Sequence, residues 1–129
     1  MINIILILII NMLTLSCEDI VENKEVEVAI IVAFTTGQSD PQGDGSNNSS
    51  YQKYANVRYT VKNTDSDTIT GWKIYFNVNT DSNQQISVGG RFAGTIEPGE
   101  TSSERIAKDV IAAGIGNAVS ASLKLVEAW

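Results

Sequence analysis

Residues 54–78, YANVRYTVKNTDSDTITGWKIYFNV, carry two runs in which apolar and polar side chains alternate. Alternation with a period of two is typical of β-strands that bury one face. The apolar faces hold Ala55, Val57, Tyr59 and Val61 in the first run, and Trp72, Ile74, Phe76 and Val78 in the second. A polar segment, 63–67, separates the runs, so we expect these two strands to form an antiparallel hairpin.

The same alternation extends outward over most of the chain. Residues 25–34 predict a first strand, and further strands are expected at 85–88, 91–96, 102–107 and 119–126. Glu97-Pro98-Gly99-Glu100 predicts a type II turn, because proline presets φ and the following glycine accepts a positive φ. Residues 108–117 lack alternation, and 109–113 are expected to form a helical turn. About seven strands predict an all-β fold, a single immunoglobulin-like antiparallel β-sandwich over 28–129.

The composition argues against catalysis and against several kinds of partner. The chain has no histidine, and Cys17 is its single cysteine. The common nucleophilic triads need histidine, and zinc, copper and haem sites are usually built from imidazole and thiolate. The nine Lys and Arg residues are scattered and the net charge is -6, whereas nucleic-acid binding needs a clustered basic surface. We therefore expect a protein that is not an enzyme and that has no cofactor, metal site or nucleic-acid partner.

The first residues predict export and a lipid anchor. Residues 2–15, INIILILIINMLTL, form an apolar run shorter than the roughly 20 residues of a membrane-spanning helix, which favours a cleaved signal peptide. Residues 13–17, LTLSC, resemble a bacterial lipobox, in which a small residue precedes the cysteine that is lipidated. The resemblance implies a signal peptide over 1–16 and lipidation at Cys17. The alternative is that 2–15 form a buried helix or strand and that Cys17 is a core thiol.

An acidic segment follows the cysteine. Residues 18–27 contain five acids and one base, a charge density that keeps a segment solvated and extended. We therefore assign 17–27 to the lipidated cysteine and an acidic tether. Such acids resemble a surface-export signal of lipoproteins in some Gram-negative groups, and a plain solvated linker is the other interpretation. The expected location is the bacterial outer membrane, facing the periplasm or the cell surface.

Three short motifs resemble a known group of domains. They are VRYTVKNT at 57–64, GWKIYF at 71–76 and EPGE at 97–100. Together they resemble FxLYD-type and related immunoglobulin-like domains of secreted proteins and lipoproteins, which implies a sandwich fold and no particular activity. Asn63-Thr64 and Ile69-Thr70-Gly71-Trp72 are similar to bacterial cellulose-binding modules, where exposed tryptophans in a flat row bind the glycan. Trp72 is in phase with Ile74 and Phe76, so we expect it in the core.

The candidate binding surface consists of Tyr51, Tyr54, Tyr75 and Trp129, beside the long polar loop 36–50. Exposed aromatic rings could contact a sugar or a protein. The other interpretation is that each ring covers a sheet edge or fills a second core layer. Residues 40–47, DPQGDGSN, place oxygen ligands as a calcium loop does, but the closing Glu is missing, which favours a hydrophilic loop.

Two functions fit these features. The first is a non-catalytic, lipid-anchored binding module that contacts a glycan or an envelope protein. The second is a structural or accessory subunit of a larger envelope complex, assembled through a sheet edge or the C-terminal strand that ends at Trp129.

Overall fold

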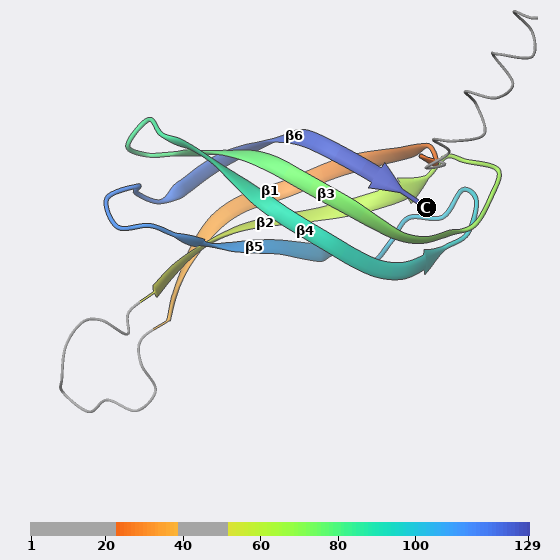
Figure 1. The fold of residues 1–129 in the computed structure, drawn as a ribbon, viewed down its shortest axis with the longest axis horizontal. Helices are drawn as coiled ribbons and strands as arrows, with labels where there is room; N and C mark the ends of the chain where they lie inside the picture. The colour runs from red at the N-terminus through yellow and green to blue at the C-terminus, as the bar shows by residue number, and fades with distance from the viewer. Residues whose placement is uncertain (1–22, 39–51) are drawn as a thin grey trace, which may run out of the picture.

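A computed structural model describes residues 23–38 and 52–129 of the chain. Within these ranges it contains six strands and no helix (Figure 1). The strands are β1 (Val26–Gln38), β2 (Gln52–Asn63), β3 (Ile69–Thr80), β4 (Gln85–Ile96), β5 (Arg105–Ile111) and β6 (Ala118–Ala128). The predicted signal peptide, Cys17, Tyr51 and segment 40–47 lie outside the described residues.

The strands form two antiparallel three-stranded sheets, in the orders β1-β2-β5 and β4-β3-β6. The predicted all-β antiparallel sandwich is therefore confirmed, with six strands instead of about seven. The strand neighbours match A-B-E and C′-C-F of an immunoglobulin-like sandwich. Strands D and G of that fold have no counterpart among residues 23–38 and 52–129. β1 begins at Val26, so the last two residues of the predicted tether already pair with β2.

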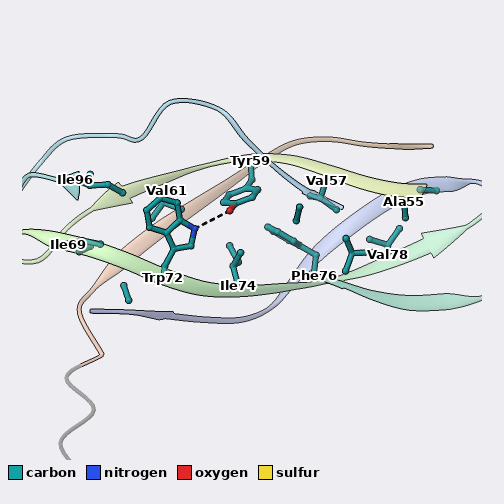
Figure 2. Close-up of a cluster of buried hydrophobic side chains, with 14 of the residues drawn as sticks. Ala55, Val57, Tyr59, Val61, Ile69, Trp72, Ile74, Phe76, Val78 and Ile96 are labelled. Carbon is teal, nitrogen blue, oxygen red and sulfur yellow. Dashed lines mark hydrogen bonds between the residues drawn. The ribbon is translucent and has the colours of Figure 1, made fainter. Parts of the chain in front are cut away.

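The core lies between the sheets and is built from the two alternating runs. All eight apolar residues named for these runs are completely buried. Trp72 Nε1 on β3 donates a hydrogen bond to Tyr59 Oη on β2 at 3.0 Å, across the core (Figure 2). Phe76 and Phe92 pack against the Tyr59 ring, with centroids 5.2 and 5.8 Å away. The position expected for Trp72 is thus confirmed, and the bond ties one sheet to the other.

The predicted hairpin of β2 and β3 is wrong, because the two strands belong to different sheets. The chain crosses between the sheets at Asn63, which is fully buried. Asn63 Nδ2 donates to the carbonyls of Asp67 and Ile96, both at 2.8 Å, and its Oδ1 accepts from the Asp65 N–H at 2.8 Å. These bonds satisfy a buried amide and fix the corner, so the two apolar faces oppose each other instead of lying side by side.

Two further strand predictions need correction. Residues 85–88 and 91–96 form one strand, β4, with Gly89 and Gly90 inside it. Residues 109–111 continue β5, so the helical turn at 109–113 is wrong: this segment pairs with β2 as far as Ile111. The turn at 97–100 is confirmed, since Gly99 has φ 81° and the Glu100 N–H donates to the Glu97 carbonyl at 3.0 Å.

The two open sides of the sandwich are closed by hydrogen bonds between edge strands. At the β1–β6 side, the Lys24 N–H donates to the Ala128 carbonyl at 2.9 Å, and the Ala118 N–H to Thr35 Oγ1 at 2.7 Å. At the β4–β5 side, the Gly89 N–H donates to Asp109 Oδ2 at 2.9 Å. Arg105 Nη2 lies 3.4 Å from the Ala93 carbonyl. Two inward-pointing charged side chains of β5 therefore occupy the backbone edge of β4.

Candidate functional site

The structure divides the candidate aromatic residues between opposite faces of the sandwich. Tyr75 and Trp129 lie on the outer face of the β4-β3-β6 sheet, since the neighbouring Ile74 and Phe76 point into the core. Tyr54 lies on the outer face of the β1-β2-β5 sheet, next to the buried Ala55. The predicted residues therefore belong to two separate surfaces, which the structure does not bring together.

Trp129 lies flat over a glycine. A Cβ atom added to Gly71 would be 2.8 Å from three atoms of the Trp129 indole. The Trp129 N–H donates to the Gly71 carbonyl at 3.0 Å, and the Arg91 guanidinium carbon lies 4.8 Å from the ring centroid. The indole is half-buried. Gly71 is thus required at this position, because any side chain would displace the ring.

Tyr75 also packs against a glycine. It pairs directly with Gly89 on β4 and with Leu125 on β6. A Cβ atom at Gly89 would be 2.7 Å from Tyr75 Cδ1, so the phenol extends over a position that has no side chain. Tyr75 and Gly71 are four residues apart on β3, which separates the two rings by about 13 Å along the strand.

Polar side chains surround both rings. Lys73 lies between them on β3 and forms an ion pair with Glu127 at 3.5 Å, and Asn77 follows Tyr75 toward the other end of the strand. We call this surface the tyrosine–tryptophan face; it is defined by Lys73, Tyr75, Asn77, Arg91 and Trp129. Half-buried aromatic rings can stack on the apolar face of another ring. The neighbouring amide, ammonium and guanidinium groups can donate hydrogen bonds to hydroxyl or carboxylate oxygens.

The opposite sheet presents two cations over aromatic rings, an arrangement that the sequence analysis missed. The Arg58 guanidinium carbon lies 5.4 Å from the Phe34 ring centroid, and Lys108 Nζ lies 4.2 Å from that of Tyr54. The residues of each pair come from different strands, and Lys108 belongs to the segment that had no recognised strand pattern. The pairing of β2 with β5 was therefore needed to find the second pair.

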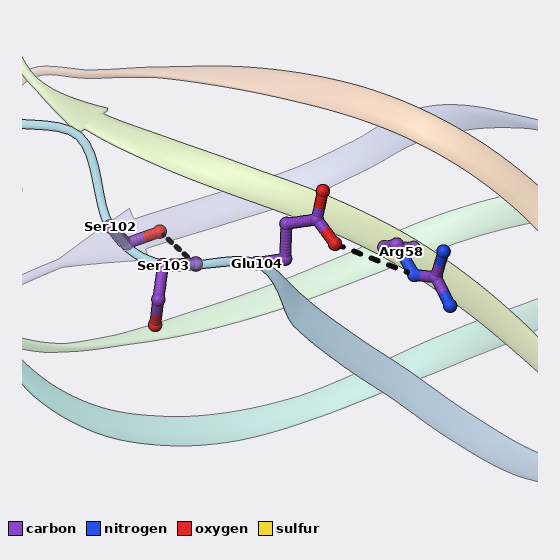
Figure 3. A network of polar contacts seen from close by, with 4 residues as sticks. All are labelled: Arg58, Ser102, Ser103 and Glu104. Carbon is purple, nitrogen blue, oxygen red and sulfur yellow. Dashed lines mark hydrogen bonds and ion pairs between the residues drawn. The ribbon is translucent and has the colours of Figure 1, made fainter.

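Arg58 also contacts an acid at the start of β5. Its Nε lies 3.8 Å from Glu104 Oε2 (Figure 3). The segment before Glu104 is fixed by Ser102, whose Oγ accepts from the Val61 N–H and donates to the Ser103 carbonyl, both at 2.9 Å. Both members of the ion pair are well exposed, so this contact positions the guanidinium and adds little stability.

Two cavities occur at opposite ends of the sandwich. One, of about 340 Å³, is lined by residues 23–26, Thr64 and Val126, where β1 begins. The other, of about 270 Å³, is lined by Lys53, residues 111–114 and Gly116, beside the β5–β6 turn. Lys53 Nζ donates to Asn117 Oδ1 at 3.0 Å at that end. The first lining contains the charged residues Lys24 and Glu25, whereas small side chains make up most of the second.

The described residues contain no group of three or more Asp, Glu, Cys or His side chains placed to hold a metal ion. In the same part of the chain, no helix has the length and hydrophobicity of a membrane span. No protein-family model matches the sequence, and neither the curated proteins nor the solved structures contain a significant match to it.

Proposed function

We propose that the chain is an exported, non-catalytic interaction module that a lipid on Cys17 anchors to the bacterial outer membrane, facing the periplasm or the cell surface. The lipobox-like residues and the acidic segment after them support this address. The sandwich begins at the end where β6 finishes (Figure 1), since Lys24 is bonded to Ala128. Asn23 is six positions after Cys17, a reach of at most about 20 Å, so a lipid would hold this end near the membrane.

The tyrosine–tryptophan face is the binding surface in this proposal, and the ligand is a glycan. The observation that carries the proposal is that Tyr75 and Trp129 both lie over glycines on one outer face. The Tyr75 ring can stack on the flat C–H face of a pyranose ring, whereas Arg91 lies over the Trp129 ring and can donate to hydroxyl or carboxylate oxygens there. The neighbouring Lys73 and Asn77 provide donors for hydroxyl or carboxylate oxygens.

The anchor is tested by metabolic labelling of the full chain with a clickable fatty acid. We expect label on the wild type and none on Cys17→Ala. Cys17→Ser is the closest control, because it keeps the size of the side chain and removes only the thiol. Equal labelling of the wild type and both variants, or of none, would refute the anchor and leave Cys17 without an assigned role.

Glycan binding is tested on the full chain, solubilised in detergent, with arrays of bacterial polysaccharides and by affinity electrophoresis. We expect retention by at least one polysaccharide, and about tenfold weaker retention for Tyr75→Ala, since one base or ring stacked on an aromatic contributes roughly 1–3 kcal/mol. Tyr54→Ala is the matched control on the opposite face and should bind like the wild type. Retention that is equal in both variants would place the binding surface elsewhere.

A second candidate function is that of an accessory subunit in an envelope complex. The observation that favours it is the C-terminal edge strand, on which Val119, Leu123 and Leu125 are 57%, 42% and 38% exposed. Exposed aliphatic side chains in one strand are typical of a contact with another protein. Co-purification of a stoichiometric partner that is lost in Leu123→Ser, with no glycan retained by the wild type, would favour this function over the first.

A further inference from the structure

The outer face of the β1-β2-β5 sheet carries a second, chemically different surface. Val32, Ile106 and Val110 are 40%, 44% and 57% exposed there. The strand register places Val32, Arg58 and Ile106 in one row across the sheet, and Tyr54 beside Val110 in another. Between these rows lie Phe34, Asn56 and Lys108. We call these eight residues the cation–aromatic face.

A buried amide holds the centre of this face in one arrangement. Asn56 points outward from β2 but is only 3% exposed, because its neighbours cover it. Its Nδ2 lies 3.0 Å from Thr36 Oγ1, 3.2 Å from the Tyr54 carbonyl and 3.4 Å from the Phe34 carbonyl. The Asn56 side chain is therefore held in one conformation beneath its neighbours, and this order in the free protein reduces the entropy lost when a partner binds.

The chemistry of the face favours a protein over a glycan. Arg58 and Lys108 lie over the rings of Phe34 and Tyr54, so the ring faces are covered and are not open for a sugar to stack on. The most exposed atoms belong to aliphatic side chains, which gain by removal from water and offer nothing to hydroxyl groups. Exposed aliphatic groups, aromatic rings and an arginine are the composition of the centre of a protein interface.

The charge of the face determines what the partner must present. The eight residues include two cations and no acid, although the whole chain has a net charge of -6. At the edge of the face, the exposed Glu104 contacts Arg58 at 3.8 Å. Many of the acids lie instead at the end where β1 begins, in Glu25 and the 65–67 and 97–100 turns. A protein with carboxylates opposite Arg58 and Lys108 would match the face in both charge and hydrophobicity.

We propose that the cation–aromatic face docks a protein whose contact surface is aliphatic at the centre and carries Asp or Glu side chains opposite Arg58 and Lys108. Three strands about 4.8 Å apart and five residues long cover about 230 Å², against the roughly 800 Å² that each partner buries in a stable complex. The face is therefore the centre of the interface, and its flanks form the rim. This docking site is separate from the tyrosine–tryptophan face and does not depend on glycan binding.

The test is photo-crosslinking in the host cell, with a photoreactive amino acid placed in the full chain at Val110. Thr95, an exposed residue of β4 on the other sheet, is the matched control position. We expect a discrete protein adduct from Val110 and none of that size from Thr95. Mass spectrometry of the crosslinked peptide should show aliphatic residues flanked by Asp or Glu.

Charge reversal then tests the predicted chemistry. Lys108→Glu and Arg58→Glu should each lower the adduct yield about tenfold, and Lys108→Arg should preserve it. Reversal of the facing acid in the identified partner should restore the yield with Lys108→Glu. An unchanged thermal midpoint would show that the variants are folded. The proposal is overturned if Val110 gives no adduct, if it crosslinks to phospholipid or to a second copy of the chain, or if charge reversal leaves the yield unchanged.

Discussion

Replacing Tyr59 by phenylalanine removes a single oxygen atom from the middle of the core. That oxygen accepts the side-chain hydrogen bond that joins β2 to β3 across the core, from Trp72 Nε1 at 3.0 Å. Both side chains are completely buried, so water cannot replace the lost acceptor without opening the core. The indole N–H of Trp72 would remain in the folded protein as an unsatisfied buried donor.

The cost follows from that unsatisfied group. A buried donor without a partner costs about 1–3 kcal/mol, and the substitution leaves no large cavity, because phenylalanine has the same ring. In a domain of this size each kcal/mol lowers the thermal midpoint by about 4–8 °C. We therefore expect Tyr59→Phe to fold, with a midpoint about 4–20 °C below that of the wild type.

Urea and thermal unfolding, followed by far-UV circular dichroism, measure the effect. Tyr75→Phe is the matched control, since it removes the same atom from a side chain on the outer face and should change stability by less than about 0.5 kcal/mol. An equal midpoint for Tyr59→Phe and Tyr75→Phe would refute the reasoning. It would mean that the Trp72 N–H is satisfied in another way or that the sheets are not tied at this point.

The remaining predictions concern pH, backbone space and the corner. Burial raises the pKa of Tyr59 to about 12, so above pH 10 the phenol loses its proton in the unfolded chain before it does so in the folded protein. The free energy of unfolding should therefore fall by up to about 1.4 kcal/mol per pH unit until about pH 12. Alkaline unfolding of the wild type and of Tyr59→Phe measures this loss. Gly89→Ala should destabilise by about 1–3 kcal/mol because its Cβ would meet the β3 backbone, whereas Gly90→Ala, with open space around it, should not; urea unfolding of the pair separates them. Asn63→Ala should cost about 1–3 kcal/mol in the same assay, since it leaves the buried Ile96 carbonyl without a donor. A loss below about 1 kcal/mol would mean that the corner does not depend on this amide. Hydrogen bonds from the Glu25 and Asp67 N–H groups lower the pKa of Asp65, so the contribution of its carboxylate to stability is present at neutral pH and is lost as pH falls below 3.8. The difference in thermal midpoint between the wild type and Asp65→Asn should therefore shrink as pH falls below 3.8.

The core was predictable because alternation alone identifies the side of a strand that is buried. The apolar faces of β2 and β3 are completely buried, as the pattern indicated. Alternation does not say whether two such strands lie in the same sheet or in opposite sheets. That choice depends here on Asn63, whose bond to the Ile96 carbonyl reaches a residue far along the chain.

The errors in β4 and β5 have local causes. The Gly89-Gly90 pair is typical of a break, but a side chain at Gly89 would meet the backbone of Ile74 and Tyr75 on the neighbouring strand. In β5 the side that faces inward includes Arg105 and Asp109, so polar residues occur on both sides and the alternation used to recognise strands is lost. Both signals depend on a neighbouring strand and are absent from the local sequence.

The two surfaces were predictable to different degrees. Tyr75 was correctly placed opposite Trp72, because the two residues share one strand and their phase is fixed. Tyr54 was grouped with Tyr75 and Trp129 although it lies on the other sheet. The contact of Lys108 with Tyr54 could not be foreseen, since it requires the register of β2 against β5.

The inward charges of β5 also bear on how the protein behaves at high concentration. An uncovered edge strand is a template on which an identical chain can add its own strand, and repeated addition leads to fibres. Asp109 and Arg105 occupy the backbone groups of β4 that such a strand would use. With the proposed lipid anchor, the protein would meet its copies in two dimensions, where local concentrations are high. The inward charges that make the apolar–polar pattern of β5 irregular therefore also oppose self-templated polymerisation at the edge of β4.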